Sequence, residues 1–315
     1  MDRREFLRAA AAAGVVSAFG GVESHGDASL PRRPLGKTGE RLSIVGMGGV
    51  VVIGMEQNVA NRTVRDAIGR GVNYFDVAPS YGNGEAEEKL GAALKGHRGR
   101  VFLACKTGRR DAAGAREELA ESLERLQTDR VDLYQLHGLM KVEDADKALA
   151  KGGAIEAFVE AKKQGRVRFL GFSAHSVDAA LSAMERFEFD TVLFPINWVC
   201  YFKGNFGPQV VKAAQAKNMG ILALKAMARC PRPKGAEPDY PKCWYQPETD
   251  PETAALALRF ALSEPITAAI PPGDERLFEP GLATAERFKL ISKDERASLQ
   301  KLAQNVEPLF SHSGS

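Results

Sequence analysis

The stretch VFLACKTGRRDAAGAREELAESLERLQTDRVDLYQLH, residues 101–137, holds one complete strand–helix–strand unit. Two short runs, Val101–Lys106 and Val131–His137, are apolar with little polar alternation, which indicates strands covered on both faces. Between them, Ala115–Leu126 carries leucines at helical spacing. Two parallel strands need a crossover of this kind, and a helix is the usual one. The stretch therefore predicts a parallel α/β architecture.

The same alternation continues on both sides of this unit. The expected strands are, in chain order, Leu42–Gly48, Asn73–Val77, Val101–Lys106, Val131–His137, Phe169–Ser173, Thr191–Asn197, Ile221–Lys225 and Thr267–Ile270. Such a series favours a (β/α)8 barrel of the TIM type. An open doubly wound sheet is the alternative, but Gly46-Met-Gly-Gly49 after the first strand lacks the third glycine of the G-x-G-x-x-G motif. Arg33–Arg41, with a turn signal at Lys37–Gly39, predicts a short N-terminal β-hairpin that covers one end of the barrel.

The composition excludes several classes of protein. The 315 residues are 44% hydrophobic and 26% charged, which is an ordinary globular mixture. Lys and Arg number 43 against 40 Asp and Glu, and the two signs are interspersed, so nucleic acid is not an expected partner. The four cysteines have no C-x-x-C spacing, and no metal site is expected.

The first 28 residues are expected to lie outside the barrel. The pair Arg3-Arg4 is followed, after Glu5, by Phe6-Leu7 and then by the weakly apolar run Ala9–Val22. This start looks like a twin-arginine export leader, with residues 1–28 as signal peptide and 29–315 as one barrel domain. The apolar run is too short and too mild for a stable membrane span. The leader predicts the twin-arginine machinery as a partner and a periplasmic location, whereas an amphipathic N-terminal helix docked on the domain is the alternative.

Polar residues follow three neighbouring strands at their carboxyl ends, which form the catalytic rim of barrel enzymes. The second strand runs into Asp76-Val-Ala-Pro-Ser-Tyr-Gly82, the third ends at Lys106, and the fourth ends at His137. The D-x-A-x-x-Y-G motif, together with this order of Asp76, Tyr81, Lys106 and His137, resembles the catalytic set of the aldo-keto reductases. The resemblance implies an oxidoreductase that transfers hydride between NADP(H) and a small carbonyl, alcohol or sugar-like substrate.

The four residue types suit carbonyl reduction. A carbonyl that accepts hydride gains negative charge on oxygen, and Tyr81 would supply the proton. The Lys106 ammonium is expected to lower the pKa of Tyr81, and Asp76 would neutralise the buried lysine. His137 would hydrogen-bond the substrate oxygen. The alternatives are a structural ion pair of Asp76 and Lys106, and an aldolase using Lys106 as a Schiff base, which leaves the Asp and Tyr without a purpose.

The resemblance also implies residues that contact the cofactor. They are Gly48, Ser173, Asn197, Lys225, Gly273 and Arg276. Lys225 would meet the pyrophosphate, and the loop around Gly273 opens a helix, which suits a phosphate. A solvated lysine on the rim is the alternative for Lys225.

This chain departs from the family pattern at several cofactor positions. Ala174 and Leu193 stand where the family offers amides, and Pro272 and Pro280 replace a lysine and an asparagine. Asp274-Glu275 adds negative charge where a 2′-phosphate would bind, so NAD(H) remains open beside NADP(H). These departures keep two alternative functions open, a barrel that binds NADP(H) without turnover and a sugar-active enzyme with a tightly held nicotinamide.

Two connections are longer than usual and follow strand carboxyl ends, so both are candidate substrate loops: Gly138–Gly153 and Ala228–Asp250. Cys230 and Cys243 bracket the second of them. A disulfide between these cysteines and two independent thiols are both open.

Overall fold

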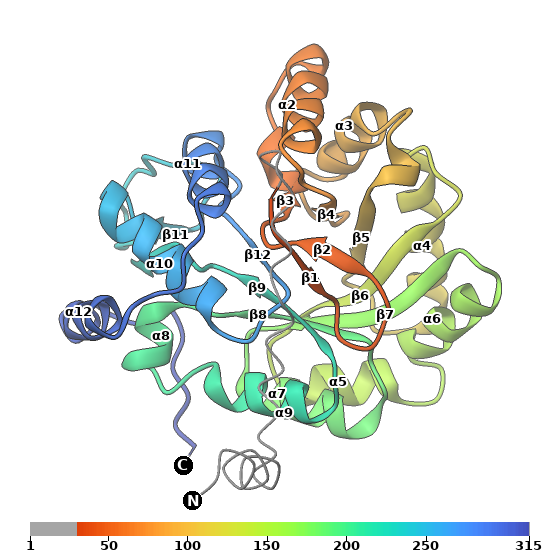
Figure 1. Cartoon of the computed structure of the whole chain (residues 1–315). Helices are drawn as coiled ribbons and strands as arrows, with labels where there is room; N and C mark the ends of the chain where they lie inside the picture. The colour runs from red at the N-terminus through yellow and green to blue at the C-terminus, as the bar shows by residue number, and fades with distance from the viewer. Residues whose placement is uncertain (1–29, 315) are drawn as a thin grey trace, which may run out of the picture.

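The computed structural model describes residues 30–314, and at its centre lies an eight-stranded parallel sheet. The strand order is β12-β9-β8-β7-β6-β5-β4-β3, and a parallel bridge between Val45 and Ala269 joins the two edges (Figure 1). The strands are β3 Met47–Gly48, β4 Tyr74–Asp76, β5 Phe102–Thr107, β6 Val131–Leu139, β7 Val167–Ala174, β8 Thr191–Pro195, β9 Gly220–Leu224 and β12 Ala268–Ile270. The predicted (β/α)8 TIM barrel is confirmed.

Helices lie on the outside of this barrel (Figure 1). The α-helices are α2 Gln57–Gly69, α3 Glu85–Ala93, α4 Ala112–Arg125, α5 Val142–Leu149, α6 Ala154–Lys163, α7 Val177–Arg186, α8 Trp198–Phe202, α9 Pro208–Ala216, α10 Pro251–Ser263, α11 Glu275–Glu286 and α12 Lys293–Ala303. Two short 3₁₀ helices are η1 Gly49–Val52 and η2 Arg98–Arg100. Asp111 caps α4, Ser176 caps α7 and Ser292 caps α12, each by accepting a backbone N–H.

Side chains alternate along each strand between the barrel interior and the helices. Tyr74, Phe102 and Leu133 belong to the interior cluster, whereas Phe75 and Leu103 pack in the larger core between sheet and helices. The alternation follows from the pleat of a strand, which points successive side chains to opposite faces. The interior is therefore a packed core, and an active site is expected at the carboxyl ends of the strands.

The predicted N-terminal hairpin is present as β1 (Arg32–Pro34) and β2 (Arg41–Ser43), which pair antiparallel. Leu35 is fully buried and packs in the interior cluster, and the Lys37 N–H donates to the Asn218 carbonyl at 3.0 Å. Gly36 has φ +52°, and a Cβ there would overlap the backbone of residues 218–220. The hairpin thus closes the barrel at the amino ends of its strands (Figure 1).

The structure corrects three details of the expected elements. The run Leu42–Gly48 is divided, because its start pairs in the hairpin, Val45 bridges to β12, and Met47–Gly48 forms the barrel strand that pairs with β4. The segment 138–153 contains α5, and the segment 228–250 contains an antiparallel pair, β10 Ala228–Pro231 and β11 Tyr245–Pro247. The expectation of a leader in residues 1–28 lies outside the described residues. Within residues 30–314, no helix combines the length and the apolar character that crossing a membrane requires.

Candidate active site

Asp76, Tyr81, Lys106 and His137 meet at the carboxyl ends of β4, β5 and β6. The Lys106 ammonium is ion-paired with Asp76 and donates to the Tyr81 hydroxyl at 3.1 Å and to the Val77 carbonyl at 3.2 Å. The Tyr81 and His137 rings meet edge to face, with centroids 5.8 Å apart. A buried lysine therefore connects the carboxylate to the phenol, and the phenol faces the imidazole.

Burial and charge act in opposite directions on Lys106 and Tyr81. Burial lowers the pKa of Lys106, but Asp76 and Tyr81 outweigh it and leave that pKa raised, so the ammonium is a permanent cation. Burial raises the pKa of Tyr81, and the charge of Lys106 opposes this rise without cancelling it. The lysine acts on the tyrosine in the expected direction, but the net shift is upward. Tyr81 consequently keeps its proton at neutral pH and can donate it.

His137 is neutral at physiological pH. Burial lowers its pKa to about 3, and the positive charges of Lys106, Arg110 and Lys225 act in the same direction. A neutral imidazole can still donate one hydrogen bond from a ring nitrogen. It can therefore polarise an oxygen atom without adding a charge to the site.

Two residues that were not assigned a role from the sequence form hydrogen bonds with Asp76. The Tyr74 hydroxyl donates to Asp76 Oδ2 at 3.2 Å, and Gln135 Nε2 donates to the same oxygen at 3.1 Å. Both side chains are fully buried. The signal was available in the sequence, because Tyr74 stands two residues before Asp76 and Gln135 two before His137, which puts each pair on one face of its strand.

A second cluster lies at the mouth of the barrel around Lys225. Its Nζ is 3.1 Å from His175 Nε2, 5.3 Å from the centre of a Trp244 ring and 5.9 Å from that of Phe310. Phe310, from the chain that follows α12, also stacks on His175 with centroids 5.4 Å apart. Burial lowers the pKa of Lys225 to about 7, and Lys106 contributes in the same direction. Within residues 30–314, no carboxylate forms an ion pair with Lys225.

Ser173 and Asn197, which were expected to contact the nicotinamide, are engaged within the protein. Ser173 Oγ accepts the Gly138 N–H at 2.8 Å. Asn197 Oδ1 accepts two N–H groups at the start of α8, while its Nδ2 donates to the carbonyls of Lys225 and Ala228 at 3.0 and 2.7 Å. Both amide hydrogens and both oxygen lone pairs of Asn197 are thus used. Its observed role is to hold the loop that carries Lys225.

The expected phosphate-binding residues lie around the start of α11. Gly273 packs so closely on η1 that a Cβ would overlap Val50, and Gly48 lies beside Ile270 at the end of β3. The guanidinium of Arg276 forms two hydrogen bonds with Asp274, at 2.8 and 2.9 Å, and stacks on Tyr240, while the Arg276 N–H donates to the same carboxylate at 3.2 Å.

Lys242 is a cation at this place that the sequence did not reveal. It comes from the segment between β10 and β11 and donates to Glu275 at 2.9 Å and to the Val51 carbonyl at 2.8 Å. Asp274 and Glu275, whose charges seemed to disfavour a phosphate, are therefore each paired with a cation. The contact could not be read from the sequence because it joins residues 33 positions apart.

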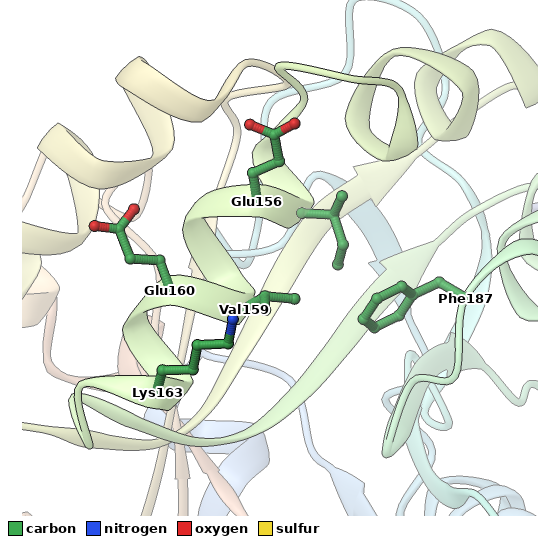
Figure 2. A pocket seen from close by; sticks show the side chains of 6 residues that line it. Glu156, Val159, Glu160, Lys163 and Phe187 are labelled. Atoms are coloured by element: carbon green, nitrogen blue, oxygen red, sulfur yellow. The ribbon is translucent and has the colours of Figure 1, made fainter.

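Other features of the described residues lie apart from this site. A surface cavity of about 340 Å³ is lined by α6 and Phe187, and the carboxylates of Glu156 and Glu160 point away from that ring (Figure 2). A second cavity, of about 490 Å³, lies between β10 and residues 305–307. Neither cavity is lined by any of the four residues Asp76, Tyr81, Lys106 and His137, which we call the tetrad. Among residues 30–314, no three His, Cys, Asp or Glu side chains are grouped to hold a metal, and Cys230 and Cys243 are free thiols.

Eight parallel strands around an apolar interior, with Asp, Tyr, Lys and His gathered at their carboxyl ends, define a TIM barrel with an acid–base site in its mouth. Residues 45–303 match the model of the aldo/keto reductase family. The chain belongs to this family.

Individual relatives are more distant. The uncharacterized oxidoreductase YqkF of Bacillus subtilis is 36% identical over 157 residues, which are 46% of this chain and 49% of that protein. L-galactose dehydrogenase of Arabidopsis thaliana is 30% identical over 211 residues, or 62% and 65% of the two chains. The chain thus spans about half to two thirds of the length of these curated relatives. An aldo-keto reductase of Klebsiella pneumoniae in complex with NADPH shares the fold, with a TM-score of 0.67, 20% identity, and 89% and 97% of the two chains covered.

Proposed function

We propose that this protein is an oxidoreductase of aldo-keto reductase type that transfers hydride between NADP(H) and a small carbonyl or alcohol. The observation that carries the proposal is the contact of Lys106 with both Asp76 and Tyr81, beside the ring of His137. Tyr81 is the general acid and base, Lys106 and Asp76 tune it, and His137 orients the substrate. The family match and the oxidoreductase names of two relatives support this reading.

The proton path follows from the charges of the site. A reduced nicotinamide, when bound, supplies the hydride that adds to the carbonyl carbon. The carbonyl oxygen, on which negative charge develops, then accepts the phenolic proton of Tyr81. Lys106 lies 3.1 Å from the phenol oxygen and stabilises the phenolate that remains. His137, which is neutral, donates a hydrogen bond to the same substrate oxygen and fixes its direction toward Tyr81.

The residues at the mouth fit a dinucleotide phosphate. Lys225 is a half-buried amine whose polar neighbour is the neutral ring of His175, so its charge has no carboxylate to balance it within residues 30–314. A pyrophosphate supplies that balance. At the other end of the site, Arg276 and Lys242 bring two cations to the start of α11, and this pair suits a further phosphate. NADP(H) is the first choice, since a relative was solved with NADPH, and NAD(H) is the alternative.

The decisive experiment compares the purified protein with its Tyr81→Phe variant. We expect NADPH oxidation with one or more members of a carbonyl panel, and a fall in kcat of about 10²- to 10⁴-fold in the variant. The affinity for NADPH should change little, because the role assigned to Tyr81 is proton transfer to the substrate and not cofactor binding. Equal turnover by both proteins, or no binding of either nicotinamide cofactor, would overturn the proposal.

One observation favours the rival function of a barrel that binds NADP(H) without turnover. Asn197 has no amide group left for the nicotinamide. Tight co-purification of NADP(H) with no turnover of any carbonyl would support that rival. Rapid turnover would exclude it.

We further propose that residues 1–28 are a twin-arginine leader and that the barrel domain, residues 29–315, works in the periplasm. The support is the pair Arg3-Arg4 ahead of a short, mild apolar run. The test fuses residues 1–28 to a folded reporter protein in a bacterium with this export pathway. Export that is lost in the double variant Arg3→Lys, Arg4→Lys is the expected result. Export that survives this change, or a reporter that stays in the cytoplasm, would contradict the proposal.

A further inference from the structure

Arg110 lies in the loop between β5 and α4 and reaches the end of β6. Its Nη2 donates to the carbonyl of His137 at 2.7 Å and to that of Gly138 at 3.3 Å, while Nη1 donates to the Gly108 carbonyl at 3.2 Å. The side chain is half-buried. Its charge is felt by the neighbouring imidazole, because Arg110 is one of the three cations that lower the pKa of His137. Arg110 therefore borders the place where the substrate carbonyl is expected.

The guanidinium of Arg110 has no ion-pair partner among residues 30–314. The acids that influence it from further away are Asp144 and Glu118, and both have other partners. Asp144 accepts the N–H groups of residues 140 and 141, and Glu118 accepts from the hydroxyl of Thr107 and the N–H of residue 108. Burial lowers the pKa of Arg110, which shows that these distant acids do not offset its loss of solvent.

The hydrogen-bond capacity of Arg110 is also incomplete. A guanidinium has five N–H donors, and the three contacts to carbonyl oxygens use three of them at most. Because both hydrogens of Nη2 are used, the donors that remain for a ligand are Nε–H and one N–H of Nη1. The charges nearby are already assigned, since Asp76 balances Lys106, and Lys225 is assigned to the cofactor. Among residues 30–314, Arg110 is therefore a cation near the mouth that has no carboxylate partner and no role assigned toward the cofactor.

We propose that Arg110 binds an oxyanion of the substrate, so that the substrate is a carbonyl compound that also carries a carboxylate or a phosphate. This inference rests on the proposed function. Arginine suits the role because it stays charged and donates charge-assisted hydrogen bonds to the oxygens of such a group. The hydrogen bonds to the carbonyls of residues 137 and 138 hold the guanidinium in place, and one of those residues is the proposed substrate-orienting histidine.

The test uses aldehydes that differ in charge but share a ring: 4-formylbenzoate, its methyl ester and 4-formylphenyl phosphate. For each we compare kcat/KM in the wild type, Arg110→Gln and Arg110→Lys. Arg109→Gln is the matched control, because Arg109 is the adjacent arginine, is 59% exposed and lies 3.7 Å from Glu118. In Arg110→Gln, the ratio of kcat/KM for an anionic aldehyde to that for the ester should fall about 10- to 100-fold. Arg110→Lys should retain part of the ratio, and Arg109→Gln should keep it.

The outcomes separate the inference from the proposed function. The anionic aldehyde that the wild type prefers, carboxylate or phosphate, identifies the oxyanion. A ratio that is the same in wild type and Arg110→Gln would overturn the inference while leaving the reductase intact. If no aldehyde is reduced, the proposed function fails, and calorimetric binding of 4-formylbenzoate still decides the role of Arg110. Binding that is weaker in Arg110→Gln than in Arg109→Gln would support the anion site, and equal binding would refute it.

Discussion

Asp76 is the residue on which the other members of the tetrad depend. One of its oxygens holds the Lys106 ammonium, and the other accepts hydrogen bonds from Tyr74 and Gln135. Because the two donors fix the oxygen that faces away from the lysine, they set the plane of the carboxylate. Tyr74 and Gln135 are therefore positioning residues, and they act on Tyr81 through Asp76 and Lys106.

Tyr74→Phe tests this role. The change removes one buried hydrogen bond to a charged oxygen and leaves the ring in the barrel interior, so we expect kcat to fall about 10-fold. The KM for NADPH should stay near its wild-type value, because Tyr74 is not among the residues assigned to the cofactor. The control is Tyr134→Phe, another buried tyrosine, whose hydroxyl donates instead to the Ala115 carbonyl at 3.4 Å. Equal kcat losses in both variants would show a general packing effect and contradict the positioning role.

Lys225 should make cofactor binding depend on pH. With a pKa of about 7, it is charged below that pH and attracts a pyrophosphate, and it is neutral above it. We expect the Kd of NADPH to rise with pH above 7, by at most about 10-fold per pH unit. Fluorescence of Trp244, whose ring lies 5.3 Å from the amine, offers a direct readout. Lys225→Arg should remove the dependence, since arginine stays charged throughout. A variant with the wild-type pH profile would contradict the assignment.

At the scale of elements, the β1–β2 hairpin depends on one glycine for its contact with the barrel. Gly36→Ala combines a left-handed backbone with an overlap between the new Cβ and residues 218–220, so we expect the free energy of unfolding to fall by more than about 2 kcal/mol. Gly39→Ala is the matched control. Gly39 also has a positive φ, +82°, but its Cβ would meet open space, so only the backbone cost of about 1 kcal/mol should appear. Urea unfolding measures both, and equal losses would show that the close approach is unimportant.

The strands and helices were largely predictable because their periodicity is local. The predicted helix Ala115–Leu126 lies within α4, Ala112–Arg125, except for its last residue, since the leucines at helical spacing belong to one segment. The first strand was predicted too long because an apolar run does not tell whether it pairs in a hairpin or in the barrel. Asp76, Tyr81, Lys106 and His137 could be selected since each ends a strand or follows one. Lys242 and Phe310 could not, because their contacts depend on how distant segments fold back over the mouth.

In the molecule as a whole, three half-buried ionisable bases lie at one end of the barrel. Burial lowers the pKa of His137 to about 3, of His175 to about 2 and of Lys225 to about 7. The opposite end is closed by the hairpin and the apolar interior cluster. Placing these bases at the mouth therefore lowers the free energy of unfolding. An anionic ligand bound there would raise the free energy of unfolding again.

This arrangement predicts how stability depends on pH. In the unfolded chain each histidine takes up a proton near pH 6.5, whereas in the folded protein His137 and His175 stay neutral down to about pH 3 and 2. Between those limits the unfolded state binds more protons, so the free energy of unfolding must fall as the pH drops below 6.5. Carboxylates with lowered pKa, such as Glu295, act in the same direction only below their ordinary value of 4.5. From pH 6.5 to 4.5 the two histidines should therefore set the slope, at roughly 1.4 kcal/mol per pH unit for each. Urea unfolding in this range should show about half the slope in His175→Asn, and an unchanged slope would mean that His175 already takes up its proton in the folded protein.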